Sequence, residues 1–198
     1  MLLGLDFDNT LIKYDELFFK VAREKNLIEE NFIKDKIKIR DFLRSEGKED
    51  DWTIMQGEVY GPRINEALPF CNMFEVLTSL KNKGVEMCLV SHKTKTPYLG
   101  EPHDMHAAAL GWLKAKGFFD AEGLGWKSEN IYFELTKEKK IQRIQDLRCD
   151  YFIDDLPEIL EMLPNNINKI LFSPQGTNTK SRGWVEVDSW LKISAILA

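Results

Sequence analysis

Cysteine is scarce in this chain, whose 198 residues include only Cys71, Cys88 and Cys149. An odd number of widely spaced cysteines provides neither a disulfide framework nor the close ligand pairs of a zinc knuckle. Two of the three lie in apolar runs, which indicates buried free thiols in a reducing compartment. We therefore expect a cytoplasmic protein.

Long apolar runs and an excess of basic residues are also missing. No run approaches the roughly 20 residues of a membrane-spanning helix, and the first apolar run lacks a preceding basic stretch and stops at Asp6. The 27 Lys and Arg residues face 32 Asp and Glu residues, giving a net charge of −5. This balance argues against a membrane or nucleic-acid partner, but not against a phosphorylated small molecule, whose charge a bound metal ion can offset.

Short, almost continuous apolar runs alternate with helical patterns along the chain. The runs cover residues 2–7, 85–90, 131–133, 151–153 and 169–172. Runs of this length suit strands that are covered on both faces of a parallel sheet. The helical stripes between them have recognisable ends: Gly84 and Gly117 follow two of them, and Thr136 is a candidate N-cap of a third. The alternation predicts an α/β fold with a central parallel sheet flanked by helices.

Residues 13–70 do not follow this alternation. They carry helical stripes and many charges but no convincing strand, so we expect a small helical module inserted after the first strand. The predicted division is therefore a core of residues 1–12 and 71–198 and an insertion of residues 13–70. Two segments are predicted to be loops, Ser45–Asp51 within the insertion and Ser173–Gly183 near the end of the chain.

Acidic residues follow two of the predicted strands. Asp6 and Asp8 come at the end of the first strand, and Asp154 and Asp155 follow the strand at 151–153. Sites in open α/β sheets form beyond the carboxyl ends of the strands, so these side chains are expected to meet in one crevice. Clustered carboxylates repel and need a cation or a proton to lie together. We expect Mg²⁺, with Asp6 and Asp154 as direct ligands, Asp155 direct or water-mediated, and Asp8 at the same site.

The first acidic pair suggests a specific chemistry. A carboxylate such as Asp6 can attack a phosphorus atom and form an acyl-phosphate. The Asp8 side chain points in the same direction as that of Asp6 only if the strand has ended and the chain has turned. In that arrangement, Asp8 would protonate the leaving oxygen and later activate water. Thr10 would hold this turn or contact the phosphate, and Ser91, at the end of another strand, is a second phosphate-binding candidate.

A cluster of lysines opens the helix that follows Thr136. Cations in a first helical turn oppose the helix dipole, which suggests that one of them has a functional reason to be there. Lys140 is favoured as the lysine that reaches the nucleophile and the phosphate, and Lys137 and Lys139 remain alternatives.

The loop after Ser91 contains all three histidines, His92, His103 and His106. His92 directly follows the serine, so we expect it to contact the substrate. A zinc site is the alternative, although the spacing matches no zinc motif. Three arginines of the insertion are candidates for reading a second anionic group: Arg40, Arg44 and Arg63.

Four segments, in this order, resemble the motifs of the haloacid dehalogenase superfamily of phosphotransferases. They are DFDNT (Asp6, Asp8, Thr10), CLVSHK (Ser91), TKEKKI (a lysine that opens a helix) and YFIDDLPEI (the acidic pair Asp154 and Asp155). The resemblance implies a Rossmann-like core, with the insertion at 13–70 as a short helical cap.

The resemblance also implies a reaction. Dehalogenases and phosphonatases of that superfamily lack an Asp at the position of Asp8, so its presence favours phosphate esters. We expect a Mg²⁺-dependent phosphatase that hydrolyses a phosphate monoester of a small metabolite, of the sugar phosphate or nucleotide class, through an aspartyl-phosphate. The alternatives are a phosphomutase or phosphotransferase, a polynucleotide 3′-phosphatase, and a non-catalytic binding domain. For a polynucleotide substrate, the basic stretch 34–40 is the feature to test.

Overall fold

The computed structural model describes residues 1–176 and 183–197. The chain divides into two compact units. Unit 1 is built from Met1–Ile12, Pro69–Lys93 and Gly117–Ala198, and unit 2 from Lys13–Leu68 and Thr94–Lys116. None of the helices in the described part of the chain has both the length and the hydrophobicity that crossing a bilayer requires.

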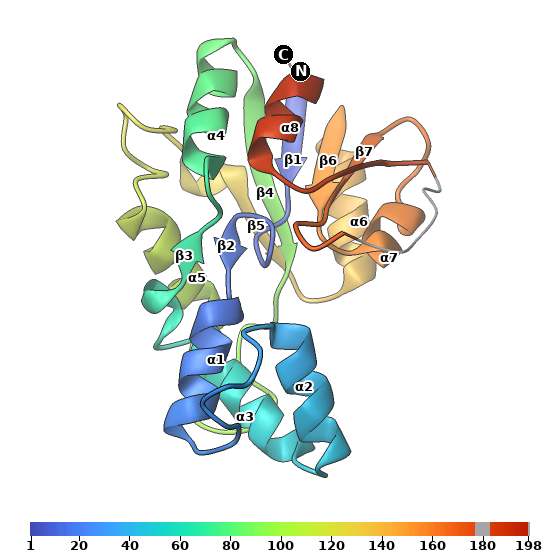
Figure 1. The fold of residues 1–198 in the computed structure, drawn as a ribbon. Coiled ribbons are helices and arrows are strands. Elements are labelled where there is room, and N and C mark those ends of the chain that lie inside the picture. Colours follow the sequence, from blue (N-terminus) through green and yellow to red (C-terminus); the bar gives the residue numbers. More distant parts are fainter. Residues whose placement is uncertain (177–182, 198) are drawn as a thin grey trace. The chain divides into compact units, whose positions relative to one another are not determined.

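Unit 1 contains a six-stranded sheet in which every neighbouring pair of strands is parallel (Figure 1). The strand order is β5-β4-β1-β6-β7-β8. The strands are β1 (Leu2–Leu5), β4 (Glu86–His92), β5 (Ile131–Glu134), β6 (Tyr151–Asp154), β7 (Asn168–Phe172) and β8 (Val185–Val187). The predicted α/β class with a central parallel sheet is confirmed. Strand β8 was not predicted, because the charged Glu186 at its centre interrupts the apolar pattern.

Close packing at the centre of the sheet depends on a glycine in β1. A Cβ atom on Gly4 would lie 2.5 Å from the ring of Phe152 and 2.9 Å from Sγ of Cys149. The absence of a side chain therefore lets the Phe152 ring lie directly against the β1 backbone. Cys88 and Cys149 pack beside it as buried free thiols, as predicted for two of the three cysteines.

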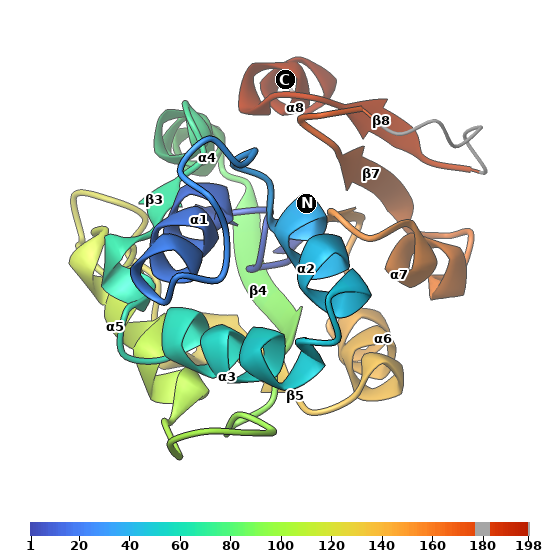
Figure 2. The ribbon, with the colours of Figure 1, turned by 60° about the horizontal axis from the view of Figure 1, so that its bottom comes forward.

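Helices cover both faces of this sheet. Figures 1 and 2 show α4 (Met73–Asn82) and α8 (Trp190–Ile196) on one face, and α6 (Lys137–Asp146) and α7 (Pro157–Met162) on the other. The end signals at two of these helices are confirmed. The Thr136 side chain accepts a hydrogen bond from the Lys139 amide of α6 at 3.2 Å, and Gly84, two residues after α4, has a φ of 81°.

Unit 2 is helical, as expected of the insertion. It contains α1 (Asp15–Glu24), α2 (Lys36–Ser45), α3 (Glu49–Tyr60) and α5 (Met105–Ala115), with a short 3₁₀ turn at Ile64–Glu66. Its core is aromatic: the Phe18 ring stacks on Trp52 with 4.9 Å between centroids, and Tyr14 and Tyr60 meet it edge-on. The short strands β2 (Ile12–Lys13) and β3 (Leu68–Pro69) pair with each other.

The units differ from the predicted division at one segment. Residues 94–116 were expected in the core, yet they group with 13–68 in unit 2. The reason is the burial of Trp112 on α5, whose indole Nε1 donates to the Ala67 carbonyl oxygen at 2.9 Å. An indole buried with its N–H satisfied in this way anchors a helix firmly.

The two predicted loops have different outcomes. The prediction for Ser45–Asp51 is wrong at its C-terminal half, because Glu49 already begins α3. Its three acidic residues, Glu49, Asp50 and Asp51, occupy the first turn, where the helix dipole favours negative charge. Within Ser173–Gly183, residues 177–182 lie outside the described part of the chain.

Candidate active site

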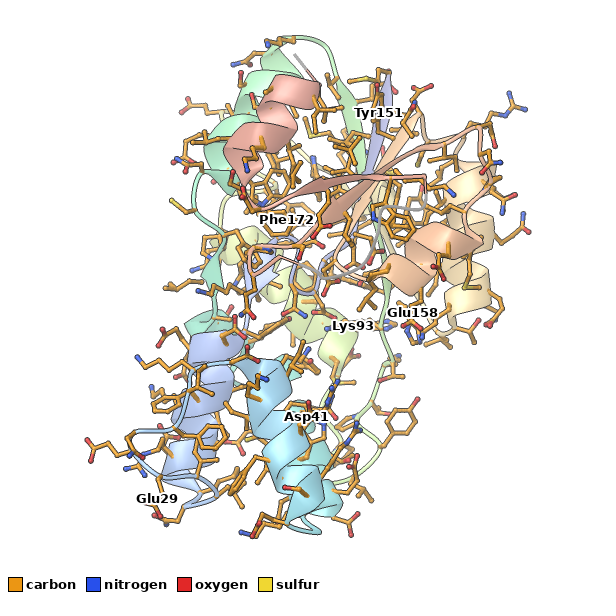
Figure 3. The ribbon with its side chains drawn as sticks, turned by 45° about the vertical axis from the view of Figure 1, so that its right-hand side comes forward. Glu29, Asp41, Lys93, Tyr151, Glu158 and Phe172 are labelled. Atoms are coloured by element: carbon orange, nitrogen blue, oxygen red, sulfur yellow. The ribbon has the colours of Figure 1, made fainter. Side chains whose placement is uncertain are left out.

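The site lies in unit 1, where β1, β4 and β6 end side by side in the sheet. Asp6, Lys93 and Asp155 are each the first residue after one of these strands, and Ser91 and Asp154 lie within the last two residues of theirs. Figure 3 labels Tyr151, which begins β6, and Lys93, which follows β4, at opposite ends of the sheet. The candidate residues therefore share the carboxyl edge of the sheet, where ligands of open α/β folds bind.

A tight turn follows β1. The Asp6 amide still donates to the Ile153 carbonyl oxygen at 2.9 Å, after which Leu11 and Ile12 both donate to the carbonyl oxygen of Phe7. The turn needs a residue in the left-handed region, and Asn9, with a φ of 56°, is of a type that tolerates it. Strand β1 therefore ends at Leu5, and Asp8 lies within the turn, where it forms an isolated bridge with Ile12.

Three carboxylates gather at this edge. Asp6, Asp154 and Asp155 each offer an oxygen, and these oxygens lie within 4.8 Å of one another. Neighbouring donors orient them, because Asp154 accepts from the Leu156 amide at 2.9 Å and Asp155 accepts from Asn9 Nδ2 at 3.3 Å. A set of hard oxygen ligands of this kind fits Mg²⁺. The Asp8 carboxylate is not part of this group.

Lys140 is the lysine that reaches the carboxylates. Its Nζ lies 2.6 Å from an oxygen of Asp6 and 2.6 Å from one of Asp154, and its side chain is buried. Burial alone would lower the pKa of Lys140, but the negative charges of Asp154 and Asp6 raise it above its usual value. Lys140 is therefore a permanent cation. The other two candidate lysines have different surroundings: Lys137 pairs with Glu158 at 2.7 Å, and Lys139 is exposed.

The Asp6 carboxyl group has an unusual acidity. Burial raises the pKa of Asp6 to about 7, against the opposing pull of Lys140, and the charges of Asp154 and Asp8 raise it further. Without a cation the cluster thus favours a proton on Asp6 near neutral pH. A divalent cation among the three carboxylates would favour the ionised form instead.

Two hydroxyl groups at the site are buried and unsatisfied. Thr10 Oγ1 and Ser91 Oγ have no hydrogen-bond partner among the described residues, although both side chains are almost fully inaccessible. Leaving a buried hydroxyl without a partner destabilises a fold by about 1–3 kcal/mol. Trp190 Nε1 donates to the Thr10 carbonyl oxygen at 3.2 Å, so the backbone carbonyl of Thr10 has a partner, whereas its hydroxyl has none among the described residues.

The histidines separate into two groups. His92 ends β4 and is half-buried in unit 1; burial lowers its pKa, and the nearby Lys140 and Lys137 charges lower it further. It is therefore neutral at pH 7. His103 and His106 belong to unit 2. No histidine joins a set of metal-ligating side chains in the described part of the chain, where the acidic trio is the only such set.

The partner of Asp8 was missed in the sequence. Lys93 is not among the residues expected at the site, but it is buried, and its Nζ lies 3.0 Å from each oxygen of the Asp8 carboxylate. A signal existed: Lys93 is only two residues beyond Ser91, at the end of an apolar strand. Nothing in the spacing, however, distinguishes it from Lys95, whose side chain is exposed.

The arginines of unit 2 are engaged with acidic neighbours. Arg44 makes two hydrogen bonds to Glu49, at 2.6 and 2.9 Å, and Arg40 contacts Asp41 at 2.8 Å. Arg63 bonds to three glutamates: Glu24, Glu58 and Glu66. Each guanidinium group thus has an intramolecular partner, which weakens the expectation that these residues read an anionic group of a substrate.

The chain has the fold of the haloacid dehalogenase superfamily, as its likeness to solved structures shows. The "putative HAD-hydrolase YfnB" of Bacillus subtilis, solved with bound magnesium, matches with a TM-score of 0.63 and 12% identity over 99% of this chain and 97% of that one. A "Putative Phosphatase" of Clostridium difficile matches with a TM-score of 0.65 and 15% identity over 100% and 98%.

Two proteins are also similar to the chain in sequence. "Putative nucleotidase OB0422" of Oceanobacillus iheyensis is 23% identical over 197 residues, which are 96% of this chain and 95% of that protein. A "Putative nucleotidase" of Bacillus cereus is 26% identical over 169 residues, 82% of this chain and 80% of that protein. No family model matches the chain.

Proposed function

We propose that this protein is a Mg²⁺-dependent phosphatase that hydrolyses a phosphate monoester of a small metabolite through an aspartyl-phosphate on Asp6. The observation that carries the proposal is the pair of unsatisfied hydroxyls, Thr10 Oγ1 and Ser91 Oγ, buried at the same sheet edge as three clustered carboxylates and the Lys140 ammonium. Phosphate oxygens accept the hydrogen bonds that these donors lack.

Two carboxylates divide the chemistry in this proposal. An oxygen of Asp6 attacks the phosphorus atom and forms the acyl-phosphate bond, while the ester P–O bond breaks and the departing oxygen takes a proton from Asp8. A water molecule then attacks the phosphorus, gives its proton to Asp8, and releases inorganic phosphate from Asp6. Both side chains return to their starting states.

The other residues act on charge and orientation. Lys140, held 2.6 Å from Asp6, stabilises the ionised nucleophile and the charge that develops on the phosphoryl oxygens. Thr10 and Ser91 orient those oxygens. Asp6, Asp154 and Asp155 would hold the Mg²⁺ ion, which supplies positive charge to the phosphoryl group when bound. Neutral His92 is suited to contact the leaving group.

The substrate class remains part of the proposal. The proteins from Oceanobacillus and Bacillus cereus carry the name nucleotidase, and a nucleoside monophosphate contains the monoester that this site would cleave. Sugar phosphates present the same group. A cytoplasmic location stays a prediction.

The basic stretch 34–40 gives little support to a polynucleotide substrate. Lys34 pairs with Glu16 at 3.0 Å, Arg40 with Asp41, and the Lys36 ammonium lies over the rings of Phe18 and Tyr60 at 5.5 and 5.4 Å. Three of the four cations of this stretch thus have acidic or aromatic partners, and this, together with the net charge of −5, argues against it as a binding strip for a phosphate backbone.

The test is phosphate release from a panel of nucleoside monophosphates and sugar phosphates, with and without Mg²⁺, for the wild type and Asp6→Asn. We expect Mg²⁺-dependent release by the wild type and a loss of at least about 10³-fold in Asp6→Asn, whose thermal unfolding should stay cooperative. Asp146→Asn, an isosteric change on the exposed end of α6, is the matched control and should keep full activity.

Three outcomes discriminate between the alternatives. Full activity of Asp6→Asn would remove the nucleophile from the mechanism. An isomeric product without free phosphate would identify a mutase. No turnover of any ester, with no effect of Mg²⁺ on thermal stability, would favour a non-catalytic binding domain.

A further inference from the structure

A second buried ammonium group lies at the site besides Lys140. The Lys93 residue is only 4% exposed, and its Nζ contacts both oxygens of Asp8 at 3.0 Å. Burying a lysine is unfavourable unless its charge is paired and hydrogen-bonded, and a carboxylate held at both oxygens satisfies that requirement. The Asp8 side chain is itself about a quarter exposed, at 23%, so the acid can still meet a ligand.

Three elements fix where this ammonium lies. The Lys93 backbone amide donates to the Glu134 carbonyl oxygen at the end of β5, at 2.9 Å. Its Nζ lies 5.5 Å from the centroid of the Phe7 ring, within cation–π range, and the Phe7 ring meets Phe133 edge-on at 6.3 Å. Lys93 is therefore held by β4, β5 and the turn after β1, and its side chain is buried and not solvated.

The pair also affects the charge of the whole site. Asp6, Asp154 and Asp155 carry three negative charges when ionised, and Asp8 carries a fourth once it has given its proton to the leaving oxygen. Lys93 and Lys140 neutralise two of these four charges, and one divalent cation would offset the remainder, so the phosphoryl group would meet no excess negative charge. A site with only one of the two lysines would keep an excess negative charge against that group.

We infer that Lys93 is a positioning residue for the proposed phosphatase reaction: by holding both oxygens of Asp8, it fixes the orientation of the carboxyl group that transfers the proton. The inference rests on the proposed function and adds a residue to it. Proton transfer depends on the acid lying within hydrogen-bond reach of the leaving oxygen, and a carboxyl group on a free turn would rotate among several orientations. Lys93 acts through Asp8 and not on the phosphate.

A kinetic double-mutant cycle tests the inference. Wild type, Lys93→Met, Asp8→Asn and the double variant are compared with p-nitrophenyl phosphate and Mg²⁺. This leaving group needs little protonation, which keeps Asp8→Asn measurable, so kcat reports the second step, in which Asp8 takes a proton from the attacking water. We expect Lys93→Met to lower kcat about 10- to 100-fold with KM changed less than about threefold. In the Asp8→Asn background, the same substitution should change kcat less than about threefold.

A stability cycle on the same four proteins provides a readout that does not depend on turnover. Urea unfolding without Mg²⁺ should show non-additive effects of Lys93→Met and Asp8→Asn, since each leaves the other group of the pair unsatisfied. Lys169→Met is the matched control: Lys169 is also a buried lysine of this sheet, but its Nζ bonds to the Leu163 carbonyl oxygen at 2.6 Å. It should lose stability without losing kcat.

Three results would overturn the inference. Unchanged kcat in Lys93→Met would show that Asp8 needs no partner. An equally large kcat loss from Lys93→Met in the Asp8→Asn background would show that Lys93 acts on the substrate directly. If the wild type releases phosphate from no ester, the proposed function is overturned, and the role given to Lys93 is overturned with it. This outcome differs from the first two, in which the wild type is active and only the role of Lys93 is contradicted.

Discussion

In the proposed reaction, the carboxyl group of Asp6 serves as a nucleophile in a place that favours its protonation. Burial and the neighbouring acids raise its pKa to about 7, so the folded protein without metal holds a proton there up to near neutrality. The unfolded chain releases that proton near pH 4. Between these two values the folded state binds more protons, and the contribution of Asp6 to stability therefore falls as pH rises.

Cation binding should depend on pH for the same reason. Below pH 7, Mg²⁺ has to displace the proton on Asp6, so we expect its affinity to be about tenfold weaker at pH 6 than at pH 8. Titration calorimetry, or the rise in melting temperature with Mg²⁺ at each pH, measures this. In Asp6→Asn the affinity should be lower but nearly independent of pH over that range. Equal affinities of the wild type at both pH values would contradict the prediction.

Single residues were predictable where their position along a strand was informative. Asp6, Asp154 and Asp155 follow apolar runs and are found together, and Lys140 is the one lysine of its cluster whose Nζ contacts Asp6. Lys93 was not recognised, because a lysine in a polar loop is ordinarily solvated. Its burial follows from the paths of β4 and β5, which no local pattern encodes.

Helix α6 links a sequence signal to the site, because it begins at a capped residue and carries Lys140 one turn later. Thr136→Ala removes the hydrogen bond to the Lys139 amide, and we expect it to lower the free energy of unfolding by about 1 kcal/mol. Thr136→Ser keeps the hydroxyl and should retain most of that stability. Urea unfolding measures both variants. Identical stability of Thr136→Ala and the wild type would mean that the cap contributes nothing to α6.

Elements were predictable in proportion to the length and regularity of their patterns. The strands β1, β4, β5, β6 and β7 were found from apolar runs, with ends shifted by one or two residues. The acidic stretch at Glu49–Asp51 was read as a loop, since charge density resembles solvated coil, whereas it is the favourable first turn of α3. Helix α5 was recognised as a helix but not assigned to unit 2, because its Trp112–Ala67 contact is long-range.

At the scale of the whole molecule, the three thiols differ in accessibility. Cys71 is exposed, whereas Cys88 and Cys149 are buried with their sulfur atoms 3.8 Å apart. We expect one thiol to react rapidly with an aromatic disulfide reagent in the native state, and all three after unfolding in denaturant. Cys71→Ser should abolish the rapid phase. Rapid reaction of two or more thiols in the native protein would show that the sheet opens around Cys88 and Cys149.

The assembly of unit 2 from two separate stretches governs how chimeras of this protein must be designed. A transplant of residues 13–68 from a relative would leave the indole of Trp112 facing a foreign backbone, so residues 94–116 have to be exchanged with it. The second splice junction falls immediately after Lys93. A donor module can therefore be exchanged as two cassettes while the recipient keeps its own Lys93–Asp8 ion pair.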